Sequence, residues 1–219
     1  MKGPRAVILD MDGVMVDSER HWRLSEDEHI RRLLPAWCEA DTQAIVGLGV
    51  VDLYRWLVKN RGLKTPEADF LSMCDRMAAD IYGSRVAVAP DLGALLGELK
   101  RRGLKLGLAS SSPAVWVGLV LDRFGLRADF SAVATGDETP GRTKPDPDLY
   151  LLAAARLGVA PAACAAVEDS RYGVQAAKSA GMRCVAYRGA ENSAQDLSAA
   201  DAEVGALRDV PAALERLAW

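Results

Sequence analysis

The chain has 219 residues, half of them hydrophobic, which is enough for one large domain or two modest ones. Its 27 basic and 30 acidic residues give a formal net charge of −3, which argues against a nucleic-acid-binding protein. It has no apolar stretch of signal-peptide or membrane-spanning length, and its four cysteines are scattered without C-x-x-C spacing. We therefore expect a cytoplasmic protein with no nucleic-acid or membrane partner.

Short apolar runs alternate with helical patterns along most of the chain. This alternation predicts a parallel β-sheet with helices on both faces, the doubly wound α/β fold. The strands are expected at 6–9, 104–109, 130–135, 163–167 and 183–187, and the helices between and after them at 91–102, 113–124, 147–157, 172–180 and 210–217.

Residues 18–85 interrupt this alternation, because their pattern is helical throughout. We interpret them as an all-helical cap domain inserted into an α/β core domain of residues 1–17 and 86–219, with hinges near 16–18 and 84–88. A second structural lobe is the alternative, but attachment beside a pair of acids favours a lid. A separate small core is expected from the apolar residues Trp22, Leu33, Leu34, Trp37, Leu53, Trp56, Leu57, Phe70, Met73 and Met77.

Asp10 and Asp12 directly follow the first expected strand, and Gly13 comes next. Alternation along a strand places residues i and i+2 on the same side, so both acids can point into one site. The carboxyl end of a parallel sheet is where ligands bind. Two carboxylates held together repel each other. The arrangement is tolerable if a divalent cation binds there or if the two acids take different roles.

Three later segments also carry polar side chains at strand ends or turns. Ser110, with the following backbone amides, could hold an anion, although an ordinary helix cap is an equal alternative. Lys144 precedes Pro145 and could neutralise phosphate, or it could be a surface lysine beside a turn. Glu168 and Asp169 end an apolar strand, where a cation or a helix N-cap would explain them.

This ordered set of residues resembles the four motifs of the haloacid dehalogenase superfamily, and the helical insertion resembles that superfamily's α-helical C1 cap. The similarity covers essentially the whole chain. Its local sequence around 14–18, 144–148 and 168–182 looks like the group of β-phosphoglucomutase and small sugar-phosphate phosphatases.

The resemblance implies a Mg²⁺-dependent reaction through an aspartyl-phosphate. It implies that Asp10 is the nucleophile and Asp12 the general acid and base. Mg²⁺ would bind the Asp10 carboxylate, the Asp12 backbone carbonyl and Asp169, with Glu168 as a further ligand or a supporting acceptor. Ser110 and the amide of Ser111 would hold the phosphoryl oxygens, and Lys144 would pair with the phosphate and Asp10. Oxygen ligands suit Mg²⁺ rather than zinc.

A simple phosphatase is the first interpretation, and β-phosphoglucomutase-type transfer is the alternative. The arginine with which the mutase grips a distal phosphate aligns with Val50, and Arg55 is a weaker substitute. The dehalogenase and phosphonate-cleaving branches are disfavoured because they lack the acid found here at Asp12. A catalytically silent binding protein is a third possibility, although every core motif position is present.

Substrate choice is expected to depend on the insertion. His21 and Trp22 follow the first hinge, and Gly47, Leu48 and Gly49 form a glycine-containing loop that could reach the site. The expected substrate is a small phosphorylated metabolite, such as a sugar phosphate or phosphoglycolate. We expect a monomer, because a lid closing over the core needs no second chain.

Overall fold

The computed structural model describes residues 3–45 and 47–219. Residues 1, 2 and 46 of the expected domains lie outside the described residues, and so do the side chains of residues 26 and 27. Within this part of the chain, six strands form one parallel sheet with the order β3-β2-β1-β4-β5-β6. The strands are β1 (Ala6–Leu9), β2 (Lys105–Ala109), β3 (Ala132–Ala134), β4 (Cys164–Glu168), β5 (Arg183–Tyr187) and β6 (Ala202–Val204).

Helices alternate with the strands, as in other α/β folds. Between β1 and β2 the chain forms four additional helices before the first helix that packs on the sheet. The helices are α1 (Glu19–Leu33), α2 (Glu39–Ile45), α3 (Val50–Arg61), α4 (Glu67–Asp80), α5 (Leu92–Arg101), α6 (Ala114–Arg123), α7 (Asp148–Leu157), α8 (Arg171–Ser179) and α9 (Val210–Arg216). A π-helical turn, Ile81–Arg85, continues α4.

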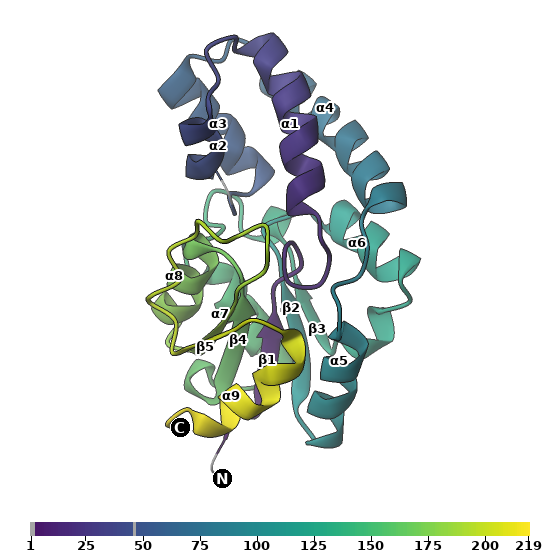
Figure 1. Ribbon diagram of the computed structural model, residues 1–219, viewed down its shortest axis with the longest axis vertical. Coiled ribbons are helices and arrows are strands. Elements are labelled where there is room, and N and C mark those ends of the chain that lie inside the picture. The colour runs from purple at the N-terminus through teal and green to yellow at the C-terminus, as the bar shows by residue number, and fades with distance from the viewer. Residues whose placement is uncertain (1–2, 46) are drawn as a thin grey trace.

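Both faces of the sheet are buried, as the continuous apolar strands predict. On β1, Val7 and Leu9 pack into one apolar cluster with α5, α6 and α9, whereas Ala6 and Ile8 pack into another with α7 and α8. Figure 1 shows these helices on opposite sides of the strands. The doubly wound α/β fold is therefore confirmed.

Helices α1 to α4 lie together beyond the carboxyl end of β1 (Figure 1). The two chain segments that connect them to the sheet run side by side. Asp17 donates its amide to the carbonyl of Ala87 over 3.1 Å, Ala87 donates its amide to the Asp17 carboxylate over 2.6 Å, and Val16 pairs with Val88. The insertion therefore leaves and re-enters the core at one point.

The apolar residues of the insertion do not form a separate core. Trp37, Leu57 and Phe70 belong to the same cluster of buried side chains as Leu9 and Val167 of the sheet. The cluster is continuous because the loop after β1, the π-helical turn and α6 fill the space between the sheet and the insertion. The expectation of an independent small core was wrong in this respect.

Candidate active site

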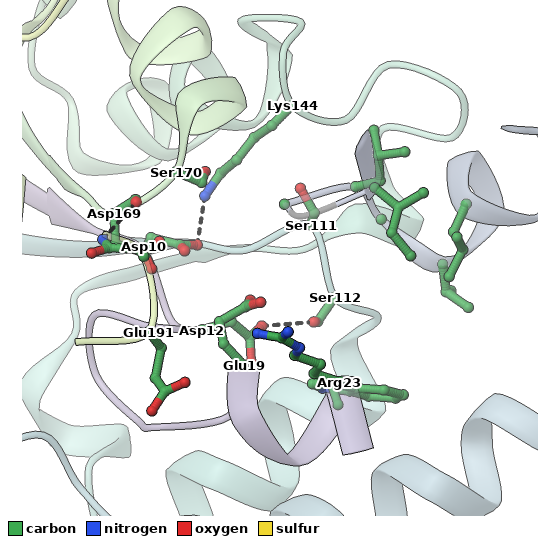
Figure 2. Close-up of a pocket in the computed structure, with 18 of the residues that line it drawn as sticks. Asp10, Asp12, Glu19, Arg23, Ser111, Ser112, Lys144, Asp169, Ser170 and Glu191 are labelled. Carbon is green, nitrogen blue, oxygen red and sulfur yellow. Dashed lines mark hydrogen bonds and ion pairs between the residues drawn. The ribbon is translucent and has the colours of Figure 1, made fainter. Parts of the chain in front are cut away.

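The ends of three neighbouring strands bring the first and last motifs together. β1 lies between β2 and β4 in matched register, so Asp10 follows Leu9 beside Val167 and Leu108. Asp10 donates its backbone amide to the carbonyl of Val167 over 3.0 Å. A pocket opens at this edge of the sheet, between it and the helical insertion (Figure 2).

Asp10, Glu168 and Asp169 form a buried acidic cluster. Each offers a carboxylate oxygen, and these oxygens lie within 4.8 Å of one another. Burial raises the pKa of Asp10 well above its usual range, the Lys144 ammonium lowers it, and Glu168 and Asp12 raise it again. Burial also raises the pKa of Asp169, with the charge of Glu19 as the next cause. Such mutual repulsion is what a bound cation relieves.

Gly13 allows the loop after β1 to approach this cluster. Its φ of 77° is in the left-handed region, and a Cβ at this position would lie 1.9 Å from Asp169 Oδ2. Any side chain at this position would therefore displace the Asp169 carboxylate, which explains on steric grounds why a glycine follows the two acids.

Lys144 is the cation of the cluster. Its Nζ lies 2.5 Å from Asp10 Oδ1 and 2.5 Å from Glu168 Oε1, and its side chain is 3% exposed (Figure 2). Burial by itself would lower the pKa of Lys144, but Asp10 and Glu168 more than offset that effect and raise it. The ammonium is therefore charged, and the alternative of a surface lysine is excluded.

Glu168 lies beneath the pocket rather than on its wall. It is fully buried and accepts hydrogen bonds from Tyr150 Oη at 2.6 Å and from the amide of Asp169 at 3.1 Å. A Cβ on Gly173 would fall about 2 Å from the Glu168 carboxylate, so α8 begins close against it. Glu168 therefore fixes Lys144 and the turn that carries Asp169.

The Asp12 carboxylate is held by three hydroxyl groups. Oδ1 accepts hydrogen bonds from Ser18 Oγ at 2.6 Å and Tyr82 Oη at 2.7 Å, and Oδ2 accepts one from Ser112 Oγ at 3.0 Å. Asp12 lines the pocket, and Figure 2 shows it on the side where Ser112 and Glu19 lie, apart from the Lys144–Asp10 pair. The two acids of the first motif thus have different surroundings.

The serines after β2 divide between two positions. Ser110 is fully buried, its Oγ accepts the amide of Ser112 at 3.1 Å, and it is not among the described residues of the pocket wall. Ser111 and Ser112 do line the pocket. The buried Oγ of Ser111 has no hydrogen-bond partner among the described residues. Ser111 thus lies at the pocket wall, and the role of Ser110 and the Ser111 amide in holding phosphoryl oxygens stays a prediction.

Most of the residues suggested from the insertion reach the pocket. Trp22, Gly47, Leu48 and Gly49 line it, whereas His21 does not and instead accepts a hydrogen bond from Arg20 Nε at 3.2 Å. A Cβ on Gly47 would lie 3.1 Å from Ser170 Oγ, and one on Gly49 would lie 3.0 Å from the carbonyl oxygen of Ser111. The glycines therefore let this loop touch the strand ends.

Several pocket residues were not anticipated from the sequence. Tyr82 and Ser112 bond Asp12, and Asn192 donates its Nδ2 to the carbonyl oxygens of Asp169 at 2.7 Å and Tyr187 at 2.8 Å. None of these three residues belongs to the motifs from which the sequence predicts the site. Further pocket residues that no pattern indicated include Glu19, Arg23, Gln43, Glu191 and Gln195.

Comparisons with known proteins agree with this geometry. The family model of haloacid dehalogenase-like hydrolases matches residues 4–181. The chain is 34% identical over 197 residues to hexitol phosphatase B of Escherichia coli K12, covering 84% of this chain and 85% of that protein. It is 33% identical over 194 residues to β-phosphoglucomutase of Bacillus subtilis, covering 83% of this chain and 82% of that protein.

A solved structure extends the likeness to nearly the whole fold. CbbY from Rhodobacter sphaeroides, in complex with phosphate, superimposes with a TM-score of 0.82 at 26% identity, covering 97% of this chain and 99% of that one. In the part of the chain that the structure describes, no helix is both long and apolar enough to cross a bilayer. The strand-end motifs, the sheet order and these matches agree: the chain belongs to the haloacid dehalogenase-like hydrolases, as an enzyme of the phosphatase type.

Proposed function

We propose that this protein is a Mg²⁺-dependent phosphatase that hydrolyses a small phosphorylated metabolite through an aspartyl-phosphate on Asp10. One observation carries the proposal. The Asp10 carboxylate is buried at a strand end, is paired with the Lys144 ammonium at 2.5 Å and faces a pocket. A carboxylate in this position can attack phosphorus while the cation offsets its repulsion from the phosphate.

The acidic cluster fits Mg²⁺. Its donors are all carboxylate oxygens, they lie within 4.8 Å of one another, and the pKa values of Asp10 and Asp169 are raised when no metal ion is bound. Asp10, Asp169 and the backbone carbonyl of Asp12 would hold the ion. Glu168, already bonded by Lys144 and Tyr150, would support them. Bound there, Mg²⁺ would offset phosphate charge.

The residues of the chain supply the remaining chemistry. The Asp10 carboxylate oxygen forms a bond to phosphorus as the bond to the leaving oxygen breaks, and Asp12 gives that oxygen a proton. Asp12 then takes a proton from the water that attacks the aspartyl-phosphate, which frees Asp10 and releases phosphate. Lys144 and the Ser111 hydroxyl, which has no hydrogen-bond partner among the described residues, hold the phosphoryl oxygens.

The pocket favours hydrolysis over mutase-type transfer. A mutase must grip a second phosphate, but Val50 lines the pocket where the mutase has an arginine, and Arg55 pairs with Asp52 at 3.2 Å. Among the described residues of the pocket wall, the basic side chains are Lys144 and Arg23. Lys144 is paired as described, and Arg23 Nη2 binds both carboxylate oxygens of Glu39 at 3.0 Å. We therefore propose a substrate with one phosphate, such as a sugar phosphate or phosphoglycolate.

The likeness to hexitol phosphatase B supports the sugar-phosphate class within this proposal. A monomer acting in the cytoplasm is part of the same proposal, and the four free cysteines fit a reducing compartment.

The test is phosphate release from a panel of phosphorylated metabolites with Mg²⁺. The panel includes hexitol phosphates, sugar phosphates, phosphoglycolate, and β-glucose 1-phosphate with a trace of its 1,6-bisphosphate and a readout for glucose 6-phosphate. Release that is abolished by Asp10→Asn and by EDTA is expected. Glucose 6-phosphate formed without free phosphate would establish a mutase, and turnover retained in Asp10→Asn would overturn the nucleophile.

A further inference from the structure

Tyr82 is buried between the insertion and the strand-end site. It is 0% exposed and lies in the π-helical turn that follows α4, near the second connection to the core. Such turns are frequent at functional sites. Arg123 of α6 donates to the Tyr82 carbonyl at 2.9 Å, which ties the turn to the core.

The Tyr82 hydroxyl connects a pocket wall to the acid. It donates to Asp12 Oδ1 at 2.7 Å and accepts the indole N–H of Trp22 at 2.9 Å. Trp22 lies on α1, lines the pocket, and stacks on Trp116 of α6 with ring centroids 5.1 Å apart. The direction of these two hydrogen bonds is fixed. The indole N–H can only donate, so the phenol must direct its own proton toward Asp12.

The hydrogen bonds on Asp12 distinguish its two oxygens. An ionised carboxylate has about four acceptor positions, two on each oxygen. Ser18 and Tyr82 fill both positions on Oδ1, whereas Ser112 fills one on Oδ2. The position still open is therefore on Oδ2.

We infer that Tyr82 is a positioning residue for proton transfer: with Ser18 it occupies Oδ1, so that Oδ2 of Asp12 carries the proton to and from the substrate. In the first step the proton leaves Oδ2 for the leaving oxygen as the bond from that oxygen to phosphorus breaks. In the second step Oδ2 takes a proton from the attacking water. Because Trp22 holds the Tyr82 hydroxyl, the acid is aligned only when the insertion is in place.

This inference rests on the proposed function, and a comparison of leaving groups tests it. An alkyl phosphate needs a proton on its leaving oxygen, whereas p-nitrophenyl phosphate loses a stabilised anion that needs none. In Tyr82→Phe, kcat/KM for the alkyl ester should fall on the order of tenfold or more, since general acids contribute roughly 10²- to 10⁴-fold. For the aryl ester it should stay within about twofold of the wild-type value.

Two further variants separate positioning from folding. Tyr54→Phe is the matched control, because Tyr54 Oη donates to the carbonyl of Thr65 at 3.1 Å within the insertion and is not among the described pocket residues. It should leave the ratio of alkyl to aryl kcat/KM unchanged. Trp22→Phe removes the indole donor but keeps an aromatic ring, so it should lower the same ratio, and it serves as the test if Tyr82→Phe does not fold.

A double-mutant comparison completes the experiment. Added to Asp12→Ala, the Tyr82→Phe change should have no further effect on the alkyl ester, because both act through one proton transfer. If Tyr82→Phe lowers kcat/KM equally for both esters, or for neither of them, the inference is overturned while the proposed function stands. If the wild-type protein hydrolyses neither ester nor any metabolite with Mg²⁺, the proposed function itself fails.

Discussion

Lys144 Nζ lies 2.5 Å from Asp10 Oδ1, although 134 positions separate the two residues in the sequence. The same ammonium lies 2.5 Å from Glu168 Oε1, so one buried cation connects the ends of two neighbouring strands. The pair therefore joins the proposed nucleophile to the packing of the site.

Replacing Lys144 by methionine should remove activity and stability together. Transition-state charge would lose its cation, for which we expect a loss of roughly 10²-fold or more in kcat. Breaking a buried ion pair by removing one partner costs about 3–5 kcal/mol. Phosphate release and urea unfolding measure the two effects. Lys59→Met, at an exposed position of α3, is the matched control and should change neither. Full activity in Lys144→Met would contradict the assignment.

Gly13→Ala should disrupt the metal site through a clash. Its Cβ would lie 1.9 Å from Asp169 Oδ2, and displacement of a ligand carboxylate should weaken Mg²⁺ activation by roughly tenfold or more. Gly62→Ala is the control, because Gly62 has a similar φ of 67° but no atom of the described residues within 4 Å of an added Cβ. Both variants bear the left-handed strain of about 1–2 kcal/mol. Titration of activity with Mg²⁺ separates them, and equal curves would exclude the steric explanation.

Serine substitutions should distinguish the two positions after β2. Ser111→Ala removes a buried hydroxyl that has no partner among the described residues, so the free energy of unfolding should be nearly unchanged. The inhibition constant for inorganic phosphate should rise roughly tenfold. Ser110→Ala removes the acceptor of the Ser112 amide and should cost about 1 kcal/mol of stability. Inhibition constants and urea unfolding provide the comparison. The reverse pattern would favour Ser110 as the phosphate ligand.

Stabilisation by Mg²⁺ should increase with pH. In the metal-free fold the pKa values of Asp10 and Asp169 are raised above 3.8, so the folded state binds protons more readily than the unfolded chain. These groups therefore contribute stability below that value and lose it as the pH rises through the raised pKa values. Mg²⁺ competes with those protons. The gain in Tm on adding Mg²⁺ should be larger at about pH 8 than at about pH 5, and an equal gain would contradict the cluster as the ion's site.

The sheet was largely predictable because its strands are short, apolar and separated by helical patterns. Ala6–Leu9 and Arg183–Tyr187 fall where the sequence predicts them. Ala202–Val204 was missed, since three residues at a sheet edge give no apolar run. The prediction of an independent core in the insertion was wrong, because residue spacing shows which side chains are buried but not which side chains they pack against.

The site was predictable where polar side chains follow a strand end or, as at Lys144, precede a proline turn. Asp10, Lys144 and Asp169 meet as the motifs imply, and their roles stay predictions. Ser110 and Ser111 are neighbours in the sequence, and only backbone geometry decides which one faces the pocket. Tyr82 reaches Asp12 across 70 positions, from a turn that carries no motif. Long-range contacts of this kind depend on the folded path of the chain.

The paired crossings at Asp17 and Ala87 have a consequence for evolution. A segment whose two ends lie side by side can be exchanged for another of different length without moving the strands that hold Asp10 and Asp169. The sheet can then keep one phosphoryl-transfer apparatus while successive inserts alter what is admitted to it. Diversity among relatives is therefore expected to concentrate in the segment between these crossings, and the strand ends beneath it should change least.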